Sequence, residues 1–251
     1  MAQFAEKDSP PPPPTMGRRP AQKRGQARVA ALLDAADALL QERDINDISL
    51  YDVAHAADVP PTSAYHFFPT KESIFLGLAD RYLQTMHAAL DAPFDYEALE
   101  HWQDLVALRY NRVVDYFNAS QNALKLFMGM ALMSDVRRLD FQDMDNLAAR
   151  TYQSMNRYFE MPYVREPAFK FSISFAIYDG VWATSYAKHG HITPKYAKEG
   201  LRAALAYMST FLPSTIAPRS PESLAQELAP KAEAATPLAA RPAPRSRRAV
   251  R

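Results

Sequence analysis

Helix-breaking residues are concentrated at the two ends of this 251-residue chain. Thirteen of the 20 prolines lie outside residues 21–212, six of them within residues 1–20 and seven within 213–251, and the whole chain has only seven glycines. Proline and glycine disfavour helix interiors more than any other residues do. A long interior with so few of them is therefore free to fold as a succession of helices.

The two ends also differ from the interior in charge. Each end, residues 1–30 and residues 213–251, carries a net charge of +4, whereas the whole chain carries only +1, so the interior is acidic. The five consecutive prolines at 10–14 favour extended polyproline. We interpret residues 1–20 as a disordered, proline-rich basic arm and residues 213–251 as a disordered basic tail.

Apolar residues recur at helical spacing through most of the interior. One such series predicts a helix near residues 29–40, a shorter one lies near 50–57, and further series follow at 74–90, 99–117, 121–134, 138–160, 165–189 and 194–212. No segment alternates in the manner of a strand. Ser49, Thr70 and Thr193 are predicted N-caps, and Gly190 is a predicted C-cap. The fold class predicted is all-α, with about nine helices.

Several functional classes lack their usual sequence features here. The chain has no cysteine, no apolar run long enough for a membrane helix and no signal-peptide pattern, so we expect a soluble, cytoplasmic protein without membrane contact. We find no phosphate loop, nucleophile elbow or di-iron spacing, and we predict no enzyme activity, metal or cofactor. His189 and His191 lie two residues apart, which does not place them on one helix face. A helical-bundle enzyme and a helical interaction protein that does not bind DNA remain the alternatives.

Two short predicted helices, at residues 49–57 and 60–67, are separated by a brief turn. This spacing is typical of a helix-turn-helix, whose second helix enters the DNA major groove. Thr62 and Ser63 lie in the first turn of the second helix, where small polar side chains can approach base edges. Tyr65 and His66 follow, and they contact phosphates in one reading or pack against the protein in the other.

The sequence from Ser49 to Glu72, with Tyr65, Phe68 and Lys71 at its most specific positions, resembles the DNA-binding signature of TetR-type transcriptional regulators. The family usually has glycine where this chain has Asp44 and Asp58. The resemblance implies a homodimer with a helix-turn-helix domain, here residues 21–68, and a regulatory ligand-binding and dimerisation domain, here residues 69–212. It further implies a small-molecule effector and a double-stranded DNA operator, which we expect to be palindromic, with repression as the expected mode. The DNA-binding candidates are Arg24, Arg28, Ser49, Pro60, Pro61, Thr62, Ser63, Tyr65, His66 and Lys71. The basic arm, including Arg18 and Arg19, either reaches a neighbouring minor groove or only adds solubility.

The interior also contains candidates for effector binding and for dimer formation. Aromatic residues and a methionine-rich patch suggest an apolar pocket for a hydrophobic or aromatic effector, although each of these residues also suits an ordinary core. The ligand-binding candidates are Trp102, Tyr110, Phe127, Met130, Met133, Tyr152, Phe175, Tyr178 and Trp182. The segment 165–189 is apolar on all sides, which favours a four-helix dimer interface with the helix that follows it over a monomer core. The dimerisation candidates are Phe169, Ile173, Gly180, Leu201, Leu205, Met208 and Phe211, with Gly180 allowing close approach of another backbone.

Overall fold

A computed structural model describes residues 23–96, 98–129 and 134–220, and this part of the chain is helical almost throughout. Its elements are α1 (Lys23–Glu42), the short 3-10 helix η1 (Ile45–Asp47), α2 (Leu50–Ala56), α3 (Pro61–Phe67), α4 (Lys71–Leu90), α5 (Trp102–Ala119), α6 (Gln121–Met128), α7 (Ser134–Tyr158), α8 (Pro167–His189) and α9 (Pro194–Met208). The predicted all-α class is confirmed. The predicted arm at residues 1–20 lies outside the described residues, as do Met130 and Met133.

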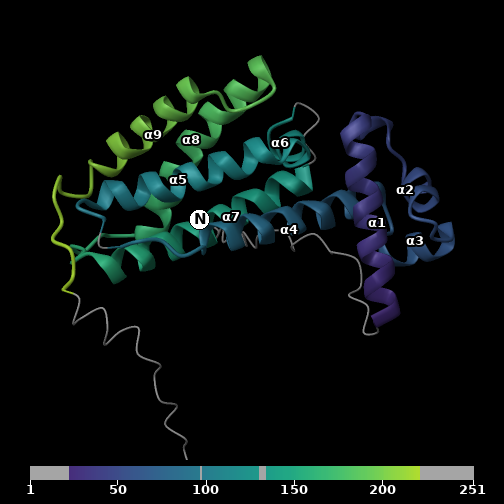
Figure 1. The fold of residues 1–251 in the computed structure, drawn as a ribbon, viewed down its shortest axis with the longest axis horizontal. Coiled ribbons are helices and arrows are strands. Elements are labelled where there is room, and N and C mark those ends of the chain that lie inside the picture. Colours follow the sequence, from purple (N-terminus) through teal and green to yellow (C-terminus); the bar gives the residue numbers. More distant parts are fainter. Residues whose placement is uncertain (1–22, 97, 130–133, 221–251) are drawn as a thin grey trace, which may run out of the picture.

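The helices form two groups that α4 connects (Figure 1). The group formed by α1, α2 and α3 lies at one end of the molecule, and α4 leaves it to run into the larger group made by α5 to α9. Within the larger group, α8 packs against both α7 and α9. One continuous set of buried apolar side chains runs through both groups, from Leu32 in α1 to Met208 in α9.

Local capping chemistry sets several helix ends as the sequence predicts. Ser49 caps α2 and Thr70 caps α4, each through a reciprocal pair of hydrogen bonds with the third residue of the helix. Thr193 caps α9 with Pro194 in the first turn. Gly190 ends α8 at φ 73°, in the left-handed region that glycine tolerates best.

The boundaries around α6 and α7 differ from the prediction. The sequence predicts helices over residues 121–134 and 138–160, whereas α6 ends at Met128 and α7 begins at Ser134. Gly129 ends α6 with extended backbone angles, φ −68° and ψ 156°. Glycine loses the most conformational entropy in a helix, so it is a natural place for the helix to stop.

The predicted start of the disordered tail, at residue 213, is too early in the sequence. Residues 213–220 pack against the end of α7, where Phe159 and Pro218 form a β-bridge and the Arg219 amide donates to the Tyr158 carbonyl at 2.8 Å. Ile216 is buried among the core residues. This apolar side chain anchors a segment whose composition alone indicates disorder, and the rest of the predicted tail lies outside the described residues.

Among the helices that the structure describes, none combines the length and the hydropathy that a bilayer crossing requires.

Candidate nucleic-acid interface and effector cavity

The turn between α2 and α3 has the geometry of a helix-turn-helix. Asp58 adopts the left-handed region at φ 50°, and its amide donates to the His55 carbonyl at 3.2 Å. Val59 follows and is buried, with its amide bonded to the Ala54 carbonyl at 3.0 Å. Asp58 therefore fills the left-handed position for which glycine is the usual residue, and the buried Val59 packs between the two helices.

Helix α3 buries one face and exposes the other. Ala64 and Phe67 point into the core of the helix-turn-helix, where both are buried. Thr62, Tyr65 and His66 are exposed, and half of the Tyr65 surface is accessible (50%). Half of Tyr65 is therefore open to a partner, while the other half packs against the chain. Pro60 and Pro61 are exposed at the start of the helix, and Ser63 is half-buried.

Two of the predicted contact residues are already used within the chain. The Ser49 hydroxyl donates to the Asp52 carboxylate and accepts the Asp52 amide at 3.1 Å, so it caps α2. The Lys71 ammonium donates to the carbonyl oxygens of Ile45 at 2.9 Å and Asn46 at 3.1 Å. These two bonds hold η1 against the start of α4 and leave one N–H of Lys71 for a phosphate. The sequence predicts Lys71 as a DNA-binding residue and gives no sign of this structural contact.

Helix α1 carries exposed positive charge. Arg24 and Arg28 lie four residues apart on α1 and are both exposed, so they lie on one face of the helix. Helix α3 itself contains no lysine or arginine. The described cations of this region therefore lie on α1, at the exposed Arg43 just after it and at Lys71, while α3 contributes hydrogen-bonding groups.

The substitution Lys71→Ala tests the structural contact directly. Two carbonyls would lose their donor, so we expect the free energy of unfolding to fall by about 1 kcal/mol. Urea unfolding by circular dichroism measures it, with the exposed Lys195→Ala on α9 as the control. An unchanged stability would contradict the role of Lys71 in holding η1. The salt dependence of DNA affinity tests its third N–H, because one lost phosphate contact lowers the slope by about 1.

Helix α4 also holds α1 through a polar network. The Arg81 guanidinium donates to the Asp34 carboxylate, and the Tyr82 hydroxyl donates to the Asp37 carboxylate. Burial and the neighbouring Asp37 raise the pKa of Tyr82 well above its usual range, so Tyr82 stays a donor. These bonds fasten α4 to α1.

Helix α6 makes a second connection to α1. The Asn122 amide donates to the Asp37 carbonyl at 2.8 Å, and the Lys125 ammonium donates to the carbonyls of Leu40 at 2.8 Å and Arg43 at 2.6 Å. A cation at the C-terminal end of a helix is favourable because it meets free carbonyls and the negative end of the dipole. The two helix groups are thus joined by α4 and by α6.

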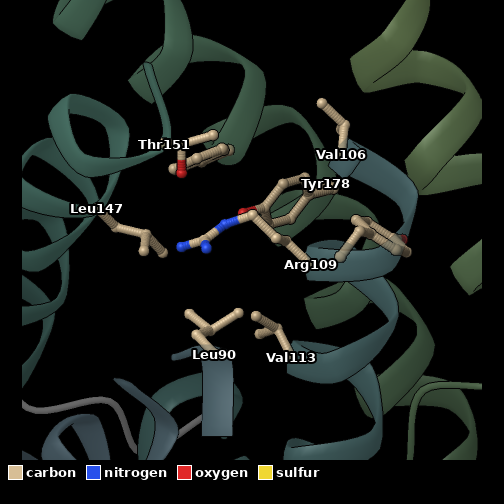
Figure 2. A pocket seen from close by; sticks show the side chains of 9 residues that line it. Leu90, Val106, Arg109, Val113, Leu147, Thr151 and Tyr178 are labelled. Atoms are coloured by element: carbon tan, nitrogen blue, oxygen red, sulfur yellow. The ribbon is translucent and has the colours of Figure 1, made fainter. Parts of the chain in front are cut away.

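A cavity lies inside the larger group, among α4, α5, α7 and α8 (Figure 2). It contains about 330 Å³ of empty space, part of which opens to solvent. Its walls are mostly apolar, with one arginine among them. The lining residues are Leu90, Val106, Arg109, Tyr110, Val113, Leu147, Thr151, Phe175 and Tyr178.

Three of the predicted ligand-binding residues, Tyr110, Phe175 and Tyr178, line this cavity. The other described candidates lie elsewhere. Trp102 is fully buried and its indole donates to the Pro213 carbonyl at 3.0 Å, while the Trp182 indole donates to the Tyr110 hydroxyl at 2.7 Å. Phe127 is buried in α6, and Tyr152 packs against Phe171. Indole donors need a partner when buried, which holds both tryptophans in the core.

The cavity residue that sequence reasoning missed is Arg109. It lies on the same face of α5 as Val106 and Val113, three and four residues away. A cation within an otherwise apolar stripe was the available signal. Burial lowers the pKa of Arg109 below its usual value. Burial likewise raises the pKa of the neighbouring Tyr178 hydroxyl.

The predicted dimerisation residues are distributed over α8, α9 and the turn that follows. Phe169 is 61% exposed although it is large and apolar, and Gly180 is also exposed. Ile173, Leu201, Leu205 and Phe211 are half-buried. The prediction that Met208 contacts a partner is wrong, because its side chain is fully buried within the chain.

Fold and surface together define an all-helical helix-turn-helix protein with a cavity in its second helix group. Residues 32–78 match the family model described as "Bacterial regulatory proteins, tetR family". The HTH-type transcriptional regulator EthR of Mycobacterium tuberculosis is 35% identical over 91 residues, which cover 35% of this chain and 42% of EthR. The alignment thus spans less than half the length of this curated relative.

Solved structures extend the likeness in fold to the larger group of helices. A TetR-family regulator from Streptomyces coelicolor covers 74% of this chain and 98% of its own, with a TM-score of 0.54 and 21% identity. RolR in complex with resorcinol covers 78% of this chain and 100% of its own, with a TM-score of 0.54 and 18% identity. The likeness to the tetR family model thus lies in residues 32–78, and the solved structures add a likeness in fold alone.

Proposed function

We propose that this chain is a homodimeric DNA-binding transcriptional repressor that a small-molecule effector releases from a palindromic operator. The observation that carries the proposal is the exposed face of α3, where Thr62, Tyr65 and His66 project from a helix whose other face is buried. A helix presented in this way can enter the major groove. Similarity to the transcriptional regulator EthR over 91 residues, 35% of this chain, supports a role in transcriptional regulation.

The exposed apolar surface of α8 supports the dimer. Phe169 is mostly exposed, and a side-chain carbon added at Gly180 would meet no atom within 4 Å. Ile173, four residues from Phe169 and on the same face of α8, is half-buried and adds apolar area to this face. A second copy of α8, with α9 beside it, would cover this surface and fix the spacing of the two α3 helices.

The effector would act through the two connections to α1. Leu90 of α4 lines the cavity, and α4 carries Arg81 and Tyr82 to the carboxylates of α1. A ligand that binds better to one position of α4 favours that position by its difference in affinity, and by no more. The expected consequence is a change in the distance between the two α3 helices of the dimer.

Selection of duplexes from a random pool tests DNA recognition. The wild-type protein should enrich a palindromic sequence, and Thr62→Ala should change the preferred base at one position of each half-site. One good base contact is worth about 1–3 kcal/mol of discrimination. The control is Thr85→Ala, an exposed threonine of α4. No enrichment by the wild-type protein would overturn the proposed function, whereas an unchanged preference for Thr62→Ala would remove only Thr62 from base reading.

A further inference from the structure

Arg109 places a positive charge inside the cavity. Figure 2 shows its guanidinium extending into the space between Leu147 and Leu90. It forms no hydrogen bond or ion pair with any residue in the part of the chain that the structure describes. An unpaired cation in apolar surroundings costs free energy. Arg109 is half-buried, so only part of its guanidinium is solvated, and an anion bound in the cavity would supply the partner that the chain lacks.

Asp91, the carboxylate that acts electrostatically on Arg109, is already bound by another arginine. Asp91 influences Arg109, but both of its carboxylate oxygens accept bonds from Arg150, at 2.8 and 2.7 Å. Arg112 lies near as a second positive charge and donates to the carbonyls of Leu90, Ala92 and Pro93. This side of the cavity therefore has more positive charge than its single carboxylate neutralises.

Two hydroxyl groups add hydrogen-bonding capacity beside Arg109. Tyr178 and Thr151 both line the cavity, and neither hydroxyl is bonded to another described residue. The remaining lining is dominated by aliphatic side chains and by the ring of Phe175. The polar groups are thus few and lie together, whereas the rest of the lining suits an apolar body. Small-molecule sites commonly have this division.

We propose that the effector is a small carboxylic acid, bound as its anion, with the carboxylate on the Arg109 guanidinium and an apolar body among Leu90, Val113 and Leu147. This inference rests on the proposed function and specifies the ligand of the same cavity. A planar guanidinium matches a carboxylate with two parallel hydrogen bonds. A phosphate ester would bring more charge than one arginine and two hydroxyls can satisfy.

The size of the cavity limits the acid. The 330 Å³ of empty space includes open solvent, so the part enclosed by the lining side chains is much smaller. A small, compact acid suits so limited a space better than a long acyl chain does. The rings of Tyr110, Phe175 and Tyr178 favour an aromatic body through edge-to-face contact.

Calorimetric titration of the full chain with three acids and their neutral amides tests the charge requirement. The probes are benzoate, phenylacetate and hexanoate, each paired with its amide, together with resorcinol as a neutral phenol. At least one acid should bind at least about tenfold more tightly than its amide and than resorcinol. Equal binding of acid and amide, tighter binding of resorcinol, or no binding by any of the three acids would overturn the proposal.

Variants of Arg109 separate a ligand-binding role from a structural one. Arg109→Met should weaken binding of the acid at least about tenfold, while Arg109→Lys retains part of it. Arg109→Met should also raise the melting temperature, because it replaces an unpaired, half-buried charge in apolar surroundings with an apolar side chain, whereas loss of a structural arginine would lower it. The matched control is Arg157→Met, an exposed arginine on α7. Unchanged affinity in Arg109→Met would overturn the proposal.

These measurements use no DNA, so their failure is distinct from failure of the proposed function. A chain that selects an operator but binds none of the three acids keeps its function and loses this ligand class. A chain that binds an acid through Arg109 but enriches no duplex keeps the ligand site and loses the regulatory function.

Discussion

Replacing Gly200 with valine should lower the free energy of unfolding by about 3 kcal/mol, because a side chain there collides with a buried hydrogen-bond network. A carbon added at Gly200 would lie 2.6 Å from the Tyr110 hydroxyl and 3.4 Å from Cβ of Tyr178. The Tyr110 hydroxyl cannot simply move away. It donates to the Ala197 carbonyl at 2.7 Å and accepts from the Trp182 indole at 2.7 Å.

That network joins three helices, which is why the effect should be large. Tyr110 belongs to α5, Trp182 to α8, and Ala197 and Gly200 to α9. Displacing the Tyr110 hydroxyl would leave a buried indole N–H without its acceptor. Urea unfolding, followed by tryptophan fluorescence and circular dichroism, measures the loss.

Gly180 provides the matched control on α8. It is exposed, and a carbon added there would meet nothing within 4 Å. Gly180→Ala should therefore stabilise the folded chain by up to about 1 kcal/mol through helix propensity. A stability of Gly200→Val equal to that of the wild type would contradict the tight packing at α9. Dimer dissociation by Gly180→Ala, measured by sedimentation, would place the partner's backbone at this position.

At these two glycines the sequence pattern does not predict which one contacts a neighbouring helix. The sequence suggested close approach at Gly180, yet within the described chain it is Gly200 that meets a neighbour. Both lie inside helices, so spacing identifies neither. Helix α8 is apolar on nearly every side, and its pattern therefore does not tell which face the other helices of the same chain cover.

Features set by local chemistry were predictable from the sequence. The capping boxes at Ser49 and Thr70 depend on residues three positions apart, and the buried Val59 depends on the turn beside it. The exposed face of α3 follows from the helical spacing of its buried residues, Ala64 and Phe67. These local features include most of the candidate DNA surface, which is why that surface was largely predictable.

Features set by tertiary contact were not predictable in the same way. Lys71 bonds to carbonyls 25 and 26 positions away, and residues 213–220 are held by α7 and by Trp102. Nor could the spacing within α5 show that the face with Arg109 encloses a cavity, since α4, α7 and α8 supply the other walls. Of the predicted aromatic residues, only those on the cavity-facing sides of α5 and α8 line the cavity.

A buried charge cluster between α7 and α8 makes stability depend on pH. Asp140 and Asp179, both buried, share the guanidinium of Arg137, at 2.8 Å and 2.6 Å. Two carboxylates on one arginine leave a net negative charge in a poorly solvated place. Burial and the charge of Asp179 raise the pKa of Asp140 to about 7, and Asp143 acts in the same direction while Arg137 opposes the shift.

Because this pKa is raised in the folded state, the folded chain should become more stable as the pH falls from about 7 toward about 4. Over that range the folded state keeps a proton on Asp140 that the unfolded chain, with a pKa near 3.9, has released. Lowering the pH from 8 to 5 should therefore add on the order of 2–3 kcal/mol to the free energy of unfolding. Above pH 7 the contribution of this group should be flat.

Asp140→Asn should remove this dependence, because the amide keeps the size of the side chain without its titration. At pH 8 the variant should be more stable than the wild type, since Arg137 then faces the single carboxylate of Asp179. Asp145→Asn, an exposed position on the same helix, should leave the pH profile unchanged. Urea unfolding at four pH values between 5 and 8 measures all three proteins. A wild-type stability that falls on acidification over this range, or an Asp140→Asn profile parallel to it, would show that Asp140 is already ionised and well paired at neutral pH.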